Sequence, residues 1–327
     1  MSYQRGTRIA PRRIRAVAAA AVLSILALTG CGSSGDADGG EGAGGEDIVV
    51  GTFSWTAAAV QTEILTQIAA DHPELGVEKV TSTNVDPAVG WAGIGRGDID
   101  VLVEVNLPNQ QHFADENAET VELVSETYGG AAQGWFVPSY LVAPGGPAEG
   151  LVSVDQLADP AYAEAVGGTL YDADPGWVTT EQNAARIEGF GLSITHSASS
   201  EAALLAELKR AYDREQPILV YLYRPHWVFN DYDLTQLEEP NPYEEGAFTE
   251  GGRSDVAIPT LAAHIAARTD LRERAPGFYE LLTKVSIPLE DIEALLAAAN
   301  EDSTLTPGDL AKQWIDQHRS EVDSWLS

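Results

Sequence analysis

Three tryptophans of this chain each follow a short apolar run, and their chemistry suits one class of ligand. Trp55 comes just after residues 48–53, Trp177 lies past residues 168–171, and Trp227 lies past residues 217–223. A quaternary ammonium group spreads its charge over methyl groups and donates no hydrogen bond. Aromatic faces offer it a negative quadrupole and apolar contact, worth about 0.5–2 kcal/mol per ring. For any one ring alone, packing in a core is an equally good interpretation, but together the three predict an aromatic cage.

The motifs of common enzymes and metal sites are missing from the sequence. There is no Gly-x-Ser-x-Gly, no phosphate loop and no His-Glu-x-x-His, and the six histidines show no close metal spacing. The glycine-rich residues 93–97 precede a predicted strand instead of following one, which does not fit dinucleotide binding. Asp172 and Asp174 are interpreted as solvated loop residues. We therefore expect no catalytic residues, no metal and no cofactor.

The charge balance excludes another class of function. The chain of 327 residues has 19 Lys and Arg against 50 Asp and Glu, a formal net charge of -31. A nucleic-acid backbone would be repelled by such a surface, so we expect no nucleic-acid partner. The single cysteine, Cys31, rules out a disulfide within the chain and any cysteine-based zinc site.

The first residues have the pattern of an export signal. Five arginines within residues 5–15 precede an uncharged apolar run at 16–28, which is shorter than the ~20 residues of a membrane-spanning helix. The run ends in Leu28-Thr29-Gly30-Cys31, which resembles a bacterial lipobox. This predicts a signal peptide at 1–30 and a lipid anchor on Cys31 at the extracytoplasmic face of the cell membrane, with a glycine-rich tether over 31–46. The alternative is a plain secretory signal with an incidental cysteine.

The remainder alternates between strand and helix patterns, which indicates an α/β fold with mostly parallel sheets. Two such blocks predict two lobes with a ligand cleft between them. Lobe 1 is expected to be discontinuous, from 47–140 and 250–327, and lobe 2 to comprise 141–249. Trp314 and Trp325 are expected on one face of a single last helix, as core anchors. The predicted strands are 48–53, 77–83, 99–105, 168–171, 217–223 and 256–266, and the main predicted helices are 56–70, 87–94, 179–189 and 200–214.

Four segments together resemble the glycine betaine/proline betaine-binding proteins of ABC importers. The resemblance runs from about residue 48 to the C-terminus. It implies a two-lobed type II periplasmic-binding-protein fold that closes on its ligand, with no cofactor and no reaction, and with an ABC permease and its ATPase as partners. The segments are Gly129-Gly130-Ala131-Ala132-Gln133-Gly134-Trp135, Asp174-Pro175-Gly176-Trp177, Arg224-Pro225-His226-Trp227, and Pro288-Leu289-Glu290-Asp291-Ile292 with Trp314 and Trp325.

The resemblance also implies roles for single residues of the second lobe. Trp177 and Trp227 match two tryptophans of the family's cage. The backbone N–H groups of Val178 and Thr179 match positions that hold the ligand carboxylate. Amides at a helix start favour an anion, so this assignment is physically sensible.

The first lobe departs from the family pattern. The third cage tryptophan belongs within residues 104–108, which contain no aromatic residue. Trp55 is our candidate for the missing wall, with Tyr140 or Tyr223 as alternatives. His112 is the nearest match to a histidine that donates to the carboxylate, and a surface histidine is nearly as good an interpretation.

Glu104, at the end of a predicted strand, adds a charge suited to a bare cation such as choline. The leading hypothesis is thus capture of glycine betaine or a related quaternary amine for an ABC importer. The second is a choline- or carnitine-type binding protein or sensor. The third is an envelope-anchored hydrolase, for which no nucleophile and base are visible.

Overall fold

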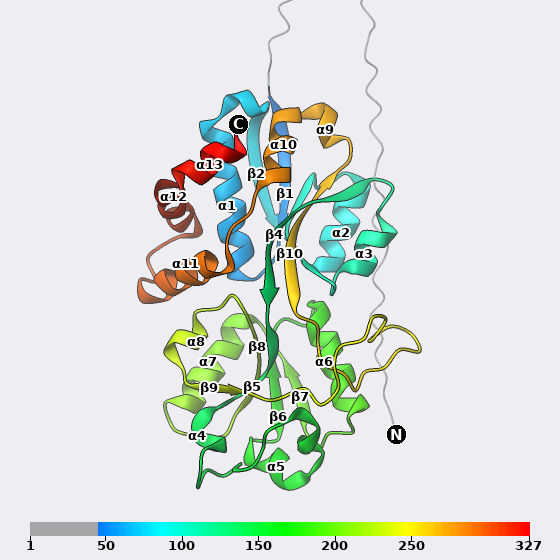
Figure 1. The fold of residues 1–327 in the computed structure, drawn as a ribbon, viewed down its shortest axis with the longest axis vertical. Coiled ribbons are helices and arrows are strands. Elements are labelled where there is room, and N and C mark those ends of the chain that lie inside the picture. The colour runs from blue at the N-terminus through cyan, green and yellow to red at the C-terminus, as the bar shows by residue number, and fades with distance from the viewer. Residues whose placement is uncertain (1–44) are drawn as a thin grey trace, which may run out of the picture. The chain divides into compact units, whose positions relative to one another are not determined.

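A computed structural model describes residues 45–327, and their strands form two five-stranded sheets (Figure 1). The predicted signal peptide, Cys31 and nearly all of the tether lie outside the described residues. Within the described part, no helix is both long and apolar enough to span a bilayer.

The first sheet has the order β2-β1-β3-β10-β4. Its first three strands are parallel, and β10 runs antiparallel to both of its neighbours. The central strand β3 is an apolar run that is almost entirely buried, as expected where helices cover both faces of a sheet. The strands are β1 (Glu46–Thr52), β2 (Val77–Asn84), β3 (Val101–Leu107), β4 (Val121–Ala131) and β10 (Leu261–Arg268).

Helices from both ends of the chain cover this sheet (Figure 1). Contacts between α1 and α12 join its first and last large helices, which makes the lobe discontinuous in sequence. The helices are α1 (Thr56–Asp71), α2 (Pro87–Arg96), α3 (Gln111–Glu116), α9 (Leu271–Arg274), α10 (Pro276–Lys284), α11 (Leu289–Glu301), α12 (Pro307–Gln317) and α13 (Arg319–Trp325).

The second sheet has the order β7-β6-β8-β5-β9. Here β6 is parallel to β7 and β8, whereas β5 is antiparallel to its neighbours. Its strands are β5 (Gln133–Pro138), β6 (Thr169–Asp172), β7 (Thr195–Ala198), β8 (Leu219–Tyr223) and β9 (Leu234–Gln236). Its helices are α4 (Ser139–Val142), α5 (Pro160–Ala165), α6 (Val178–Gly189), α7 (Glu201–Tyr212) and α8 (Val228–Asp231).

The chain passes between the sheets at two neighbouring crossings. The first lies at Ala132, between β4 and β5, and the second precedes β10. The Gln133 side chain donates from Nε2 to the Pro259 carbonyl at 2.7 Å, which joins the two crossings. The lobe boundaries expected at 140 and 250 therefore shift to about 132 and 260, because β5 pairs with β8 and residues 237–258 still pack on the second lobe.

One other prediction about local structure needs correction. The last predicted helix is two helices that break at His318, although Trp314 and Trp325 still stack with ring centroids 5.6 Å apart. The glycine-rich residues 93–97 lie at the end of α2 and precede β3, as predicted, and Gly97 caps the helix with a φ of 84° that suits glycine.

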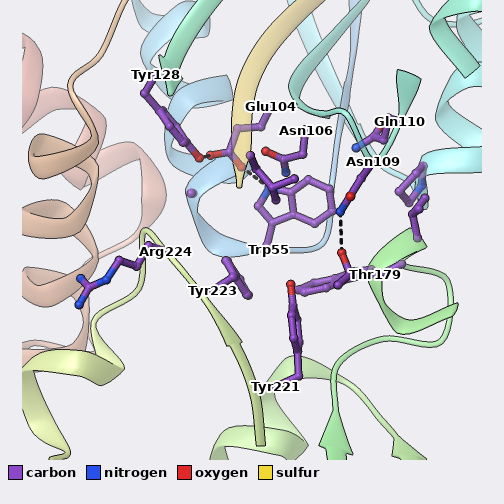
Figure 2. A pocket seen from close by; sticks show the side chains of 15 residues that line it. Trp55, Glu104, Asn106, Asn109, Gln110, Tyr128, Thr179, Tyr221, Tyr223 and Arg224 are labelled. Carbon is purple, nitrogen blue, oxygen red and sulfur yellow. Dashed lines mark hydrogen bonds between the residues drawn. The ribbon is translucent and has the colours of Figure 1, made fainter. Parts of the chain in front are cut away.

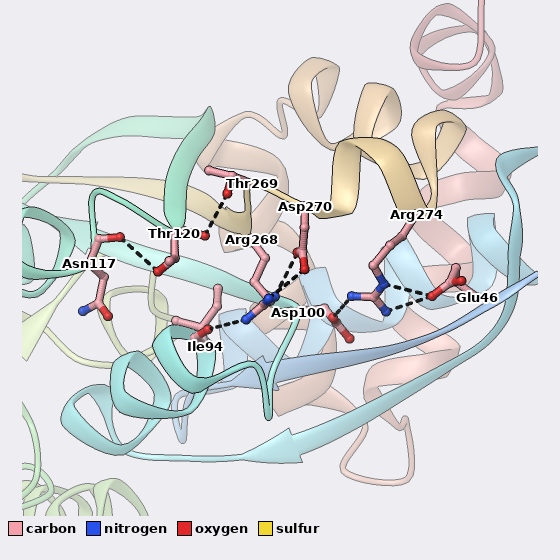
Figure 3. Close-up of polar contacts among 9 residues, drawn as sticks. All are labelled: Glu46, Ile94, Asp100, Asn117, Thr120, Arg268, Thr269, Asp270 and Arg274. Atoms are coloured by element: carbon pink, nitrogen blue, oxygen red, sulfur yellow. Dashed lines mark hydrogen bonds and ion pairs between the residues drawn. The ribbon is translucent and has the colours of Figure 1, made fainter.

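Ion pairs join residues at the start of β1, before β3 and at the end of β10, at one end of the first sheet (Figure 3). Arg274 binds Asp100 through Nη1 at 2.6 Å and Glu46 through Nε at 2.9 Å. Arg268 forms a two-point contact with Asp270. None of these residues lines the cavity between the lobes, so this network stabilises the fold and does not contribute to that cavity.

Candidate functional site

A cavity of about 40 Å³ lies where residues of the two lobes meet (Figure 2). The first lobe contributes the loop after β1, the end of β3 and part of β4. The second lobe contributes the start of α6 and the end of β8. The lining residues are Trp55, Ala57, Pro87, Glu104, Asn106, Asn109, Gln110, Tyr128, Trp177, Val178, Thr179, Tyr221, Tyr223, Arg224 and Leu261.

Aromatic rings from both lobes make up much of this wall. Trp55 and Trp177 meet edge to face with ring centroids 5.3 Å apart, and Trp177 meets Tyr223 in the same way at 5.6 Å. Tyr221 stacks on Tyr223 at 6.2 Å, and Tyr128 completes the set from the first lobe. The cavity is thus an aromatic enclosure of the kind that binds organic cations.

Glu104 places a carboxyl group in this aromatic wall, and its side chain is fully buried. Gln61 donates from Nε2 to Glu104 Oε1 at 2.7 Å, and the Trp55 indole N–H and the Tyr128 hydroxyl also donate to the carboxyl group. Burial raises the pKa of Glu104 to about 7, although these hydrogen bonds act in the opposite direction. All three donors are neutral, so the structure holds a carboxyl group here without a paired cation.

A bulge in β3 explains how Glu104 reaches the cavity. Pairing with β10 skips from Leu102 to Val105, so that Val103 and Glu104 face a single residue of the partner strand. Glu104 has a φ of 63°, in the left-handed region that non-glycine residues rarely adopt. Such bulges redirect side chains, often beside functional sites.

The start of α6 supplies backbone donors to the same cavity. Trp177 caps the 12-residue helix in an extended conformation, and Val178 and Thr179 form its first turn. No partner for the N–H groups of Val178 and Thr179 is found within residues 45–327. Unpaired amides at a helix start carry partial positive charge and bind oxygen acceptors of a ligand.

Two side-chain hydrogen bonds connect the lobes beside the cavity. Asn109 donates from Nδ2 to the Thr179 hydroxyl at 2.7 Å (Figure 2). The Trp177 indole N–H donates to the Ser54 hydroxyl at 2.9 Å. Each bond joins a cavity-lining residue of the second lobe to a residue of the first lobe, so the lobes are closed around the cavity in this structure.

Most of the residues predicted from the sequence lie in this wall. The structure brings six of them together: Trp55, Glu104, Trp177, Val178, Thr179 and Tyr223. Tyr140, the other candidate for the third wall, lies apart and donates its hydroxyl to the Gln216 carbonyl at 2.9 Å.

Trp227 and His112 do not line the cavity, which corrects two predictions. The chain turns into α8 directly after Trp227, and the ring lies against His226 and Tyr232 at 5.3 and 6.3 Å. His112 is exposed on α3, with its ring 3.8 Å from that of Phe113. It lines an adjoining, larger cavity of about 880 Å³ between α3, α6 and the segment 243–249, which shares Asn109 and Val178 with the first cavity.

Sequence reasoning missed Tyr128, Tyr221 and Asn109. Tyr221 and Tyr223 are two residues apart on β8, so the period of a strand places both on one face, and that signal was available. Tyr128 directly precedes Gly129 and Gly130, which open the segment 129–135 of the family resemblance. Nothing in the sequence marks Asn109, whose partner Thr179 lies 70 residues away.

Catalytic and metal chemistry find no support in this wall. No serine, cysteine or histidine lines the cavity, so among the described residues it contains no nucleophile with a histidine base. No group of three metal-binding side chains occurs in residues 45–327. Asp172, interpreted as a solvated residue, is instead buried in the second lobe, with the Asn183 amide at 3.0 Å and His196 Nε2 at 2.8 Å.

A family model described as the substrate binding domain of ABC-type glycine betaine transport systems matches residues 46–317. The chain belongs to this family. The role of the family is to bind a solute for an ABC transporter, which confirms the prediction of solute capture and delivery to a transporter.

Curated relatives agree with this membership. The chain is 23% identical over 285 residues to the glycine betaine-binding periplasmic protein OusX of Dickeya dadantii, covering 78% of this chain and 82% of that protein. It is 29% identical over 161 residues to the glycine betaine/carnitine transport binding protein GbuC of Listeria monocytogenes, covering 48% of each.

Solved structures confirm the predicted two-lobed α/β binding-protein fold. Lactococcal OpuAC, closed on glycine betaine, superposes with a TM-score of 0.71 at 24% identity, over 86% of this chain and all of that one. A choline-binding protein of an ABC transporter, in complex with choline, gives a TM-score of 0.71 at 20% identity, over 86% of this chain and 91% of that one.

Proposed function

We propose that this family member captures glycine betaine or a related quaternary ammonium solute in the cavity between its lobes. It then delivers the solute to an ABC permease that is driven by its ATPase. The observation that carries the proposal is the aromatic enclosure around Glu104. Rings from both lobes line one small space, so a cation is surrounded only when the lobes close.

The two ends of such a solute meet different chemistry in this cavity. The methyl groups of the ammonium lie against Trp55, Trp177 and Tyr223, near the Glu104 carboxyl group. A carboxylate or hydroxyl oxygen at the other end accepts from the Val178 and Thr179 amides. These roles are supported by the positions of the six residues in one wall and by the two amides' lack of another partner in the described chain.

The proposal includes a membrane anchor outside the described residues. Acylation of Cys31 would hold the binding lobes near the permease at the extracytoplasmic face of the cell membrane. The motif Leu28-Thr29-Gly30-Cys31 supports this step. Mass spectrometry of the membrane fraction tests it, with Cys31→Ser as the variant that loses both the lipid and membrane retention.

Tryptophan fluorescence provides the direct test of ligand capture. The purified protein is titrated with glycine betaine, proline betaine, choline and carnitine. Since Trp55 and Trp177 line the cavity, we expect saturable changes in emission for at least one of the four compounds. A silent titration for all four, supported by calorimetry without heat, would contradict the proposed function.

A further inference from the structure

The charges around the cavity do not balance. Glu104 is fully buried in its wall, and a second carboxylate, Glu201, accepts from the Tyr223 hydroxyl just behind that ring. Arg224 is the one cationic residue among those that line the cavity. Its Nη1 binds Glu293 at 2.8 Å, and its guanidinium lies 4.3 Å from the centre of the Phe229 ring. Because Arg224 is already paired, the cavity itself is net negative.

The partners of Glu104 leave its charge uncompensated. Trp55, Gln61 and Tyr128 hold the carboxyl group in place with neutral donors only. A buried carboxylate without a cation is costly, and its ionised form is favoured when an opposite charge enters within about 4–6 Å. A ligand with one net positive charge supplies that charge, whereas a zwitterion brings a second carboxylate into the same small space.

The opposite end of the cavity has an unpaired acceptor. Asn109 is 7% exposed, and its Oδ1 is buried with no hydrogen-bond partner. Neighbouring bonds fix the orientation of this amide. Gln133 donates to Pro259, so its Oε1 is the acceptor for the Thr179 hydroxyl, and that hydroxyl must then accept from Asn109 Nδ2.

A hydroxyl group suits this end of the wall better than a carboxylate does. An alcohol oxygen accepts from the Val178 or Thr179 amide, as a carboxylate oxygen also does. An alcohol can in addition donate its proton to Asn109 Oδ1. A carboxylate has no proton to donate, and it would place a negative charge close to that oxygen.

We propose that Glu104 and Asn109 make this cavity selective for a quaternary ammonium alcohol, of which choline is the simplest, over zwitterionic betaines. This inference rests on the proposed function and narrows it to one class of ligand. Glu104 acts as the specificity-determining charge, and Asn109 recognises the hydroxyl proton.

The first test compares choline with glycine betaine by calorimetry on the purified protein at pH 8. We expect wild type to bind choline at least about tenfold more tightly. Glu104→Gln should lose about tenfold or more for choline and about threefold or less for glycine betaine. Glu245→Gln, an exposed acid on the larger outer cavity, removes the same charge elsewhere and should leave both affinities unchanged. Equal losses for the two ligands in Glu104→Gln would overturn the inference.

The second test uses ligands in place of variants, so it holds even if Glu104→Gln folds poorly. 3,3-Dimethyl-1-butanol has the shape of choline without its charge, and tetramethylammonium has the charge without the hydroxyl. Both should bind wild type at least about tenfold more weakly than choline. If the uncharged alcohol binds as tightly as choline, Glu104 does not select for charge. If tetramethylammonium binds with the same affinity as choline, Asn109 does not recognise the hydroxyl group.

The third test is the pH dependence of choline binding. A bound cation stabilises the Glu104 carboxylate, so choline affinity should rise from pH 6 to pH 8 and then level off, with proton release at pH 7. The other groups that act on Glu104 are Tyr128, Tyr223 and Glu201, and His226 Nε2 lies 3.5 Å from Glu201. His226→Gln therefore serves as the control, and it should keep the pH profile of wild type. A flat profile in wild type contradicts the role of Glu104.

The outcomes separate this inference from the proposed function. If none of the compounds binds, the proposed function itself fails. If glycine betaine binds as tightly as choline, or more tightly, and Glu104→Gln leaves that ratio unchanged, the function stands and the selectivity for alcohols is wrong.

Discussion

The two halves of the cavity wall differ in what they bring to a ligand. The half from the first lobe contains Glu104, whose donors Trp55 and Tyr128 belong to the same lobe. The half from the second lobe contains Trp177 and Tyr223 and the start of α6. The charged group is thus assembled within one lobe, while the aromatic enclosure is complete only when both lobes meet.

This division shows how a two-lobed protein can attract a cation with a charged group of one lobe and enclose it with aromatic rings of the other. Trp55 stacks on Phe53 at 4.6 Å, so the first half is a prepared surface. The indole N–H of Trp177 is taken up by Ser54 of the opposite lobe. When the lobes close, the indole N–H of Trp177 therefore has a hydrogen-bond partner in the first lobe. The second half of the wall then offers the ligand only the faces of its aromatic rings and the amides of α6.

The largest expected effect concerns the stability of the first half. Folding raises the pKa of Glu104 from 4.5 to about 7, so the unfolded chain ionises first as the pH rises. Ligand-free stability should fall between pH 4.5 and 7 by on the order of 3 kcal/mol, at about 1.4 kcal/mol per pKa unit, and the loss should persist above pH 7. Glu104→Gln lacks this loss, so its stability relative to wild type should rise from pH 5 to pH 8.

Urea unfolding of both proteins at pH 5 and pH 8 measures this difference. The value at pH 5, where Glu104 is protonated when folded, gives the baseline cost of the substitution. If the stability difference between the two proteins is the same at both values of pH, the first half does not contain a destabilised carboxylate.

The next effect tests the aromatic contribution of the second half. Trp177→Ala removes the ring that contacts both Trp55 and Tyr223, so ligand affinity should fall by about a hundredfold. Trp227→Ala changes the same residue type just outside the cavity and should alter affinity by about twofold or less. Calorimetry with choline and glycine betaine measures both variants. The reverse ranking of the two variants would place Trp227 in the cage and Trp177 outside it, whereas a large loss in both variants would support the cage of both tryptophans that the sequence predicts.

A smaller effect should come from the backbone donors of the second half. Val178 is the first residue of α6, where proline is well tolerated, and Trp177 already has the extended backbone that a following proline requires. Val178→Pro removes one N–H from the cavity and should weaken binding by about tenfold. Val178→Ala keeps the N–H and is the matched control. Thermal unfolding checks that the helix is intact, and equal affinities for the two variants would exclude this amide as a donor.

The smallest effect concerns the bonds that join the halves. Thr179→Val removes the hydroxyl that accepts from Asn109 but keeps the backbone amide and the shape of the side chain. Losing one neutral hydrogen bond should cost about 1 kcal/mol, or about fivefold in affinity for every ligand. Thr195→Val, which removes a hydroxyl that is bonded to Thr169 within the second lobe, is the matched control and should leave affinity unchanged. A faster dissociation rate in stopped-flow fluorescence would locate the effect in opening, and an unchanged rate would contradict it.

Much of the fold could be predicted from local pattern. The strands β1 and β3 lie within a few residues of the apolar runs that indicate them, because burial on both faces produces such runs. The edge strand β2 is mostly exposed, and it also lies within a residue of its predicted bounds. The crossing at Ala132 could not be seen, since β4 and β5 form one nearly continuous strand pattern. Only the pairing of β5 with β8 shows where one lobe ends.

The site also contains some residues that local sequence patterns identify and others that only the tertiary structure identifies. Trp55 and Trp177 could be identified because each lies in a short loop between a strand and the helix that it caps, which is a local feature. Trp227 also precedes a helix, but its backbone is already helical, with φ of -62° and ψ of -26°, whereas Trp55 and Trp177 are extended, and no local pattern shows this difference. The role of Tyr128 depends on its distance from Glu104 in space, which no local pattern records.

The sequence by itself determined the class of protein: an acidic α/β chain with aromatic residues after its strands and the motifs of a betaine-binding family. Residue types and their local spacing are sufficient for that conclusion. Only the tertiary structure decided which side chains share one cavity, because the bulge that turns Glu104 inward and the contacts between Asn109 and Thr179 or Ser54 and Trp177 depend on chain segments far apart in sequence.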